Sequence, residues 1–253
     1  MPDYGPSTYG DRIAGVYDAW VEPNVGARTQ PAVAFLADLA QGGPALELGI
    51  GTGRVALPLA ERGVAVTGID ASSAMVERLR AKPGGANLPV VIGDFAEVDV
   101  ASRFRLVYVV FNTFFVLLEQ EDQVRCFRNV AARLAEDGVF VIEAFVPDPT
   151  LYDRGQRVSA TRVEVDRIAL DASKIDLARQ RIDSMHVFVG AEGMSLWPVQ
   201  LRYAWPSELD LMARLAGLEL RERWASWLRE PFSSTSAGHV SVYAQRTAEG
   251  TAQ

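Results

Sequence analysis

Apolar and polar positions follow two alternating periods along the first 146 residues. Short apolar runs typical of buried strands occupy residues 45–48, 64–69, 89–92, 106–112 and 139–146. Apolar residues three or four positions apart predict helices over residues 54–62, 72–82 and 119–135, and an earlier helix that starts at Thr29 and Pro31. An Asp137-Gly138 turn is expected before the last strand. Strands that alternate with helices indicate an α/β fold with a doubly wound, Rossmann-like, mostly parallel sheet.

The periodicity changes after residue 146. Three antiparallel strands are predicted over residues 162–170, 178–189 and 196–205. Arg202 is expected on the exposed face of the third. Ser207, with Asp210 three residues later, is expected to cap a helix that Gly217 ends. Two further strands, over residues 218–227 and 239–245, close the chain.

The charge balance argues against a nucleic-acid partner. The 253 residues contain 25 Lys and Arg against 32 Asp and Glu, which gives a net charge of −7. A small-molecule partner is therefore expected, because an acidic chain has no electrostatic attraction for a phosphate backbone. The antiparallel strands could pair between chains and form a homodimer.

The lack of a membrane-span or signal-peptide pattern and the single cysteine predict a cytoplasmic protein. No apolar run approaches the roughly 18 residues of a membrane span, and the first residues lack the basic and then apolar pattern of a signal peptide. The single cysteine, Cys126, excludes an internal disulfide and a cysteine-based metal cluster, and no metal is expected. Its place on the apolar side of a predicted helix indicates a buried thiol.

The segment ALELGIGTGR, residues 45–54, ends the first predicted strand with three alternating glycines. Gly49, Gly51 and Gly53 would let a ligand lie against the main chain at the point where ligands bind to such sheets. A dinucleotide fingerprint needs glycine at the sixth position of the loop, which, counted from Gly49, is Arg54 here. A phosphate-binding P-loop would end in Gly-Lys-Ser/Thr, and this loop does not. Glu47 would repel a pyrophosphate and attract a cation.

Acidic residues also follow the next two strands. Asp70 in VTGID is placed to hold both hydroxyls of a ribose. Asp94 and Phe95 in VVIGDF offer an acceptor for an exocyclic amine beside an aromatic face. Three carboxylates at successive strand ends therefore predict a nucleoside site.

These motifs, together with VTGIDAS and the strand LVYVVFNTFF, resemble the class I S-adenosylmethionine-dependent methyltransferases over about residues 30–146. The N-terminal VYDAW and the antiparallel insertion are similar to the small-molecule branch that acts on amino-sugars and other natural products. The resemblance implies S-adenosyl-L-methionine as cofactor. Its methionine end would lie over Gly49 and Gly51 near Glu47, with the ribose on Asp70 beside Ala71 and the adenine on Asp94 and Phe95.

The resemblance also implies where the reactive centre lies. Phe111 and Asn112 would border the methyl group, and Tyr17 would close over the sulfonium, since an aromatic face suits a positive sulfur. Four parts are expected: residues 1–30 as a cap, 31–148 as the cofactor-binding core, 149–205 as an antiparallel β lid, and 206–247 as a C-terminal helix and strands. The last strand is expected to complete the core sheet in antiparallel direction.

The chemistry expected is in-line methyl transfer to oxygen or nitrogen of a small molecule, which depends on alignment rather than on a nucleophilic side chain. A hydroxyl acceptor would need a base, whereas an amine must only arrive unprotonated. His186, His239 and Glu143 are the candidates for contact with the acceptor.

Two other functions stay open at this stage. One is a nicotinamide-dependent oxidoreductase, against which Arg54 argues. The other is a protein that binds S-adenosylmethionine without turnover. The strand end FNTF lacks the Asp/Asn-Pro-Pro-aromatic loop of methyltransferases acting on nucleobases or glutamine amides, which disfavours those acceptors.

Overall fold

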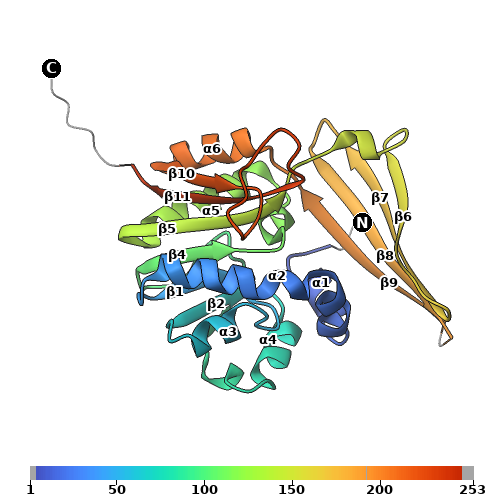
Figure 1. Ribbon diagram of the computed structural model, residues 1–253, viewed down its shortest axis with the longest axis horizontal. Helices are drawn as coiled ribbons and strands as arrows, with labels where there is room; N and C mark the ends of the chain where they lie inside the picture. Colours follow the sequence, from blue (N-terminus) through green and yellow to red (C-terminus); the bar gives the residue numbers. More distant parts are fainter. Residues whose placement is uncertain (1–3, 192, 247–253) are drawn as a thin grey trace.

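Two β-sheets of different character organise the chain in the computed structural model, which describes residues 4–191 and 193–246 (Figure 1). The larger sheet has the strand order β10-β11-β5-β4-β1-β2-β3. Its strands are β1 (Ala45–Leu48), β2 (Val66–Asp70), β3 (Val90–Ile92), β4 (Phe104–Val109), β5 (Leu134–Phe145), β10 (Leu218–Trp224) and β11 (Gly238–Gln245). The first five are parallel, whereas β11 is antiparallel to both β5 and β10. The predicted fold class is confirmed.

Helices cover both faces of this sheet, which explains the continuous apolar runs of its central strands. All four residues of β1 are buried, as are five of the six in β4. One hydrophobic cluster joins the sheet to α2 (Tyr17–Ala40) and α3 (Ala56–Glu61), and a second joins it to α5 (Gln120–Arg133) and α6 (Pro206–Leu215). The remaining helices are α1 (Thr8–Ile13), α4 (Ser73–Arg80) and the short 3-10 turns η1 (Gly85–Asn87), η2 (Thr113–Val116) and η3 (Pro149–Leu151).

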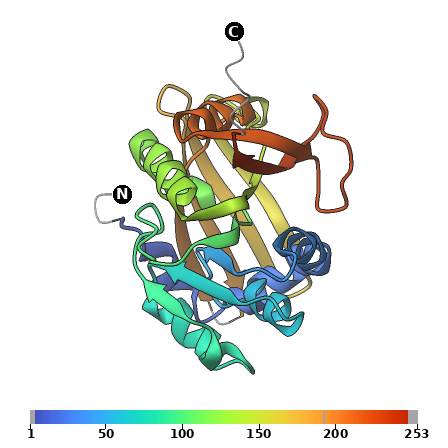
Figure 2. The ribbon, with the colours of Figure 1, turned by 90° about the vertical axis from the view of Figure 1, so that its left-hand side faces the viewer.

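The smaller sheet is an antiparallel meander that stands across one end of the larger one (Figures 1 and 2). Its strands are β6 (Gln156–Val163), β7 (Arg167–Asp176), β8 (Arg181–Gly190) and β9 (Gly193–Arg202). Helix α1 packs between β9 and α4. The carboxyl ends of the parallel strands therefore face one side of the meander.

The meander contains four strands rather than the three predicted. The predicted first strand, residues 162–170, crosses the tight connection between β6 and β7. Alternation alone does not mark such a connection, because residues 164–166 are a turn without glycine or proline. Gln180, with φ of 54°, similarly turns the chain between β7 and β8.

Helix α2 starts at Tyr17, so the start predicted at Thr29 and Pro31 is wrong. Both residues lie inside the helix, where the Oγ1 of Thr29 accepts a hydrogen bond from Arg54 Nη1 at 3.0 Å. Pro31 removes one backbone hydrogen bond from the helix. The helix nevertheless continues, because its neighbouring turns pack against α3 and β4. Local start signals therefore misled the prediction.

Two predicted turn and cap assignments are also wrong. Asp137 and Gly138 lie within β5, at an irregularity where Phe104 pairs with Leu134 but Leu106 pairs with Val139. Helix α6 is capped at Trp205 with Pro206 in its first turn, and Ser207 makes no capping hydrogen bond. Asp210 instead pairs with Arg223 of β10 at 2.6 Å, so a tertiary partner replaces the local one.

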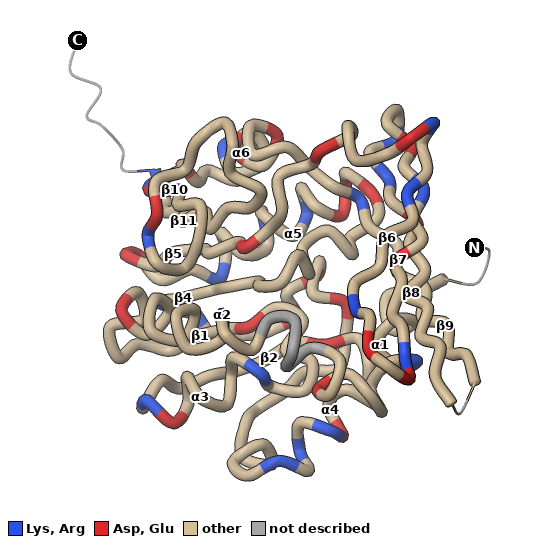
Figure 3. Tube along the Cα trace, turned by 45° about the vertical axis from the view of Figure 1, so that its right-hand side comes forward, with Lys and Arg blue, Asp and Glu red and all other residues tan. Residues whose placement is uncertain are grey.

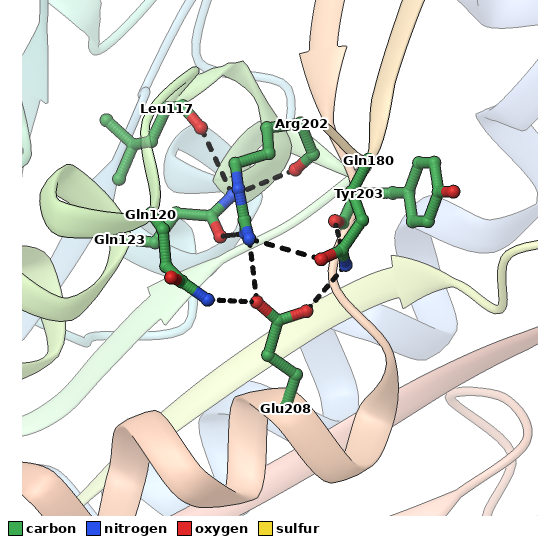
Figure 4. Close-up of polar contacts among 7 residues, drawn as sticks. All are labelled: Leu117, Gln120, Gln123, Gln180, Arg202, Tyr203 and Glu208. Carbon is green, nitrogen blue, oxygen red and sulfur yellow. Dashed lines mark hydrogen bonds and ion pairs between the residues drawn. The ribbon is translucent and has the colours of Figure 1, made fainter. Parts of the chain in front are cut away.

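Arg202 is buried rather than exposed, and it ties the meander to α5 and α6 (Figure 4). Its Nη2 lies 2.7 Å from Glu208 Oε1, and its Nη1 donates to Gln123 Oε1 at 2.5 Å. Gln120 and Gln180 also donate to the Glu208 carboxylate, at 2.8 and 2.6 Å. A fully hydrogen-bonded ion pair of this kind fixes how the two sheets meet.

Charges are mixed over the rest of the chain. Lys and Arg are interspersed with Asp and Glu along the tube of Figure 3. Within the ranges described above, no helix combines the length and apolarity that a membrane crossing demands. The thiol of Cys126 is fully buried in α5, as predicted.

Candidate active site

A cavity of about 440 Å³ lies between the two sheets, at the carboxyl ends of the first parallel strands. The strand order reverses between β1 and β4, which is the position where ligands bind in open parallel sheets. The volume suits a small molecule. Of the predicted site residues, the cavity is lined by Tyr17, Gly49, Gly51, Asp70, Ala71, Asp94, Phe95, Phe111, Asn112 and His186.

Gly51 presents bare main chain to this cavity at the tip of β1. Its φ is 55°, and a Cβ built on it would meet no heavy atom within 4 Å. Gly53 differs, because a Cβ there would lie 2.3 Å from Leu79 Cδ1. The structure thus places Gly53 against α4 and outside the cavity lining, so its missing side chain serves packing.

Asp70 fixes the glycine loop from the end of β2. Its Oδ2 accepts the Gly51 N–H at 2.7 Å, and its Oδ1 accepts the Ser72 N–H at 2.9 Å. Burial raises the pKa of Asp70 above its usual 3.8, and these two backbone hydrogen bonds oppose that shift. Each carboxylate oxygen keeps a second lone pair for a ligand hydroxyl.

Asp94 and Phe95 bring a second carboxylate and a ring to the same cavity, after β3. The Oδ1 of Asp94 accepts the Ala96 N–H at 2.8 Å, which orients the side chain. Bare main chain, carboxylates with free lone pairs and an adjacent phenyl ring fit a nucleoside that carries hydroxyl and amine donors.

Glu47 lies beneath the glycine loop rather than in the cavity lining. It is 2% exposed, and its Oε2 accepts a hydrogen bond from the Tyr108 hydroxyl at 3.0 Å. Burial raises the pKa of Glu47 to about 8, against the lowering effect of that hydrogen bond. The observed contacts of this carboxyl group are therefore structural.

Phe111 and Asn112 follow β4 in a strained backbone conformation. Their φ angles are 56° and 62°, a left-handed region that costs a residue with a Cβ about 1 kcal/mol or more. Glu143 Oε2 accepts the Phe111 N–H at 2.8 Å, and Asn112 Oδ1 accepts the Phe145 N–H at 2.8 Å. Strand β5 thus holds the loop in place at the cavity wall.

His186 faces the cavity from β8, beside aromatic rings of the N-terminal segment. The ring of Trp20 is 5.1 Å from His186 and 6.4 Å from Tyr17. Burial lowers the pKa of His186 below 6.5, while the charge of Asp171 acts in the opposite direction. Burial also raises the pKa of Tyr17 to about 12, so its hydroxyl stays protonated.

The other two acceptor candidates lie elsewhere. His239 and Glu143 line a separate cavity of about 410 Å³, and among the described lining residues it shares Phe111 and Asn112 with the first. His239 is 1% exposed, its Nδ1 lies 2.8 Å from Ser241 Oγ, and burial lowers its pKa to about 3. The structure therefore does not bring His186, His239 and Glu143 together.

Sequence reasoning missed several residues that line the 440 Å³ cavity, among them Asp171, Ser184, Val199 and Leu201. Ser184 and His186 share one face of β8 through the two-residue period of a strand, which the sequence could have shown. Asp171 lies opposite His186 in the β7–β8 register. That pairing depends on where the turn falls, and the sequence prediction misplaced these strands.

Comparison with known proteins points to one chemistry. A family model described as a methyltransferase domain matches residues 45–138. A Streptomyces protein named cypemycin N-terminal methyltransferase is 30% identical over 239 residues, covering 91% of this chain and 95% of its own length.

Solved structures agree. The CcbJ methyltransferase from Streptomyces caelestis superposes with a TM-score of 0.91 at 41% identity, over 96% of this chain and all of that one. CalS10 from Micromonospora echinaspora, described as an amino pentose methyltransferase with bound S-adenosylmethionine, has a TM-score of 0.70 at 21% identity and covers 91% of this chain and 97% of its own. The latter likeness shows the fold.

Proposed function

This chain belongs to the class I S-adenosylmethionine-dependent methyltransferases, and from that premise we propose that it methylates a nitrogen atom of a small molecule in the cavity between its two sheets. The enzyme uses S-adenosyl-L-methionine. The comparisons do not favour a nicotinamide-dependent oxidoreductase or a binding protein without turnover.

The charge of the cavity carries the proposal of a nitrogen acceptor. Its described lining includes four aspartates and one histidine, and neither Lys nor Arg. Those aspartates are Asp70, Asp94, Asp122 and Asp171. Such a wall attracts cations and repels carboxylates and phosphates, and an aliphatic amine is a cation in water.

The names of similar proteins support the same acceptor class. The 30% identical relative is named for an N-terminal methylation, and the KedS8 structure, with the same fold, is described as a sugar N-methyltransferase. The acceptor loop FNTF, which holds Phe111 and Asn112, has no Pro-Pro pair of the kind expected for nucleobase or amide acceptors.

The cavity residues can be assigned roles in this reaction. Asp70 would hold the ribose and Asp94 with Phe95 the adenine, while the main chain of Gly51 would lie against the methionine end. When bound, S-adenosylmethionine supplies a methyl group on a positively charged sulfur. The chain then has to align the acceptor nitrogen with that carbon and exclude water.

The N-terminal segment and the meander act as cap and lid in this proposal. Tyr4, Tyr9 and Tyr17 line the cavity from one side, and Ser184 and His186 line it from the meander. Rings on several sides reduce the access of water, which strengthens the electrostatic interactions inside.

Two measurements test the function in sequence. Calorimetric titration with S-adenosylhomocysteine should show binding at a single site. Pairs of small amines and the matching alcohols, incubated with S-adenosylmethionine, should then give S-adenosylhomocysteine from the amines. Product formed from alcohols alone would overturn the nitrogen assignment, and no binding of S-adenosylhomocysteine would overturn the site.

We further propose a homodimer that forms through the meander. Strand β6 is an edge strand, and Val158 and Val163 on it are 70% and 72% exposed. Light scattering should give twice the mass of one chain, and a monomer mass would refute this. The expected cytoplasmic location stays a prediction.

A further inference from the structure

We infer that Asp171, with His186 beside it and Trp20 next to His186, forms a subsite that binds the ammonium group of the acceptor; this inference rests on the proposed function. Asp171 and His186 are direct neighbours across β7 and β8, and both line the 440 Å³ cavity. The meander would thus contribute recognition as well as cover.

Asp171 carries a carboxylate oxygen whose hydrogen bond is missing. Its Oδ1 is buried and has no hydrogen-bond partner among the residues the structure describes. The nearest cation-forming atom, Nδ1 of His186, is 4.0 Å away, which is too long for a hydrogen bond. Buried acceptors are normally paired, so an unpaired one that lines a cavity indicates a ligand donor.

The other three carboxylates of the cavity already have donors. Asp70 accepts two backbone N–H groups, and Asp94 accepts the N–H of Ala96. Asp122 pairs with Arg125 at 2.7 Å. Asp171 is therefore the carboxylate best placed to balance a positive charge on the acceptor.

His186 does not neutralise Asp171. Burial lowers the pKa of His186 below 6.5, so at neutral pH its ring is mostly uncharged. The tyrosines on the facing N-terminal segment also stay neutral, because burial raises the pKa values of Tyr4, Tyr9 and Tyr17. The negative charge of Asp171 is therefore left for a ligand cation.

Trp20 supplies a second element of cation recognition and connects the subsite to the methyl-transfer region. Its indole ring is 5.1 Å from the His186 ring and 6.5 Å, edge-on, from Phe111. Electron-rich indole faces attract ammonium groups. Trp20 therefore bridges His186, the neighbour of Asp171, and Phe111, which the proposed function places beside the methyl group.

An ammonium group bound here must lose a proton before it can react. Its N–H bond breaks, the electron pair stays on nitrogen, and the proton passes to the neutral ring of His186 or to solvent. With S-adenosylmethionine bound, the lone pair on nitrogen would form the new nitrogen–carbon bond, and the electrons of the broken carbon–sulfur bond would stay on sulfur. The protonated ring of His186 then lies about 4.0 Å from the carboxylate of Asp171, and this negative charge stabilises it.

Benzylamine and benzyl alcohol test the subsite, since they match in shape and differ in charge at neutral pH. The chain has two histidines, so the ring signals of His186 can be assigned by NMR with a His186→Gln variant. With S-adenosylhomocysteine present, benzylamine should shift the His186 signals and leave those of His239 unchanged. Benzyl alcohol should bind at least about 10-fold more weakly, as expected when a charged hydrogen bond is lost.

Asp171→Asn keeps the shape of the side chain and removes its charge. The variant should bind S-adenosylhomocysteine as the wild type does, but benzylamine about 10- to 100-fold more weakly. Asp176→Asn, on the same strand and outside the cavity lining, is the matched control and should change neither affinity. Retained benzylamine affinity in Asp171→Asn, or equal binding of amine and alcohol to the wild type, overturns the subsite. If the wild type does not bind S-adenosylhomocysteine, the proposed function is refuted instead.

Discussion

Replacing Gly51 by alanine tests whether bare main chain at the tip of β1 holds the cofactor. An added Cβ would meet no protein atom within 4 Å, so it would not collide with the fold. The remaining cost to stability is the left-handed φ of 55°, which disfavours alanine by about 1–2 kcal/mol. For a chain of this size that lowers the melting temperature by about 2–8 °C.

The effect on the cofactor should be larger than the effect on the fold. The new methyl group would project into the space that the methionine end is proposed to fill, and overfilling a packed site costs about 1–3 kcal/mol. This corresponds to affinity about 5- to 150-fold weaker. Calorimetric titration with S-adenosylhomocysteine measures the affinity, and thermal unfolding without ligand measures the stability.

Gly63→Ala is the matched control for this experiment. Gly63 has a φ of 86° after α3 and also has open space at its Cβ position, but it does not line the cavity. It should show a similar loss of melting temperature and unchanged affinity. If a folded Gly51→Ala protein binds S-adenosylhomocysteine as tightly as the wild type, the proposed placement of the cofactor is refuted.

Three further predictions concern single side chains. Asp70→Ala removes the anchor of the glycine loop and the proposed ribose acceptor, so titration should show S-adenosylhomocysteine affinity about 10- to 100-fold weaker, and unchanged affinity would contradict the ribose placement. Burial alone would raise the pKa of Glu208, but hydrogen bonds from Gln180, Arg202 and Gln120 lower it below 4.5. The carboxylate therefore stabilises the fold above pH 4.5, and this contribution is lost as the pH falls through the lowered pKa. Glu208→Gln should therefore reduce the free energy of unfolding in urea by roughly 1–3 kcal/mol at pH 7 and by less at pH 3, and an equal loss at both would argue against the ion pair. Burial raises the pKa of the Cys126 thiol, so iodoacetamide should modify the native protein at least about 100-fold more slowly than the urea-unfolded chain, and comparable rates would show that α5 opens readily.

The core sheet could be predicted because its signals are local. The predicted strand β1 is confirmed from Ala45 to Leu48. A short, mostly apolar run directly before a glycine loop has few alternative structures. Asp70 and Asp94 could be assigned to one edge because carboxyl ends of parallel strands meet there whatever the exact register. The start of α2 could not be predicted, because tertiary packing overrides the proline signal at Pro31.

The side chains that would meet the acceptor depended on the tertiary structure. The sequence by itself determined the parallel sheet, the glycine loop and the acidic residues after its strands, because strand period and turn chemistry act over a few neighbouring residues. Only the folded chain separated His239 and Glu143 from His186, and only it placed Asp171 opposite His186. A shift of one residue in the β7–β8 register would turn every side chain to the other face, so the partners of His186 follow from strand pairing and packing rather than from the order of the residues.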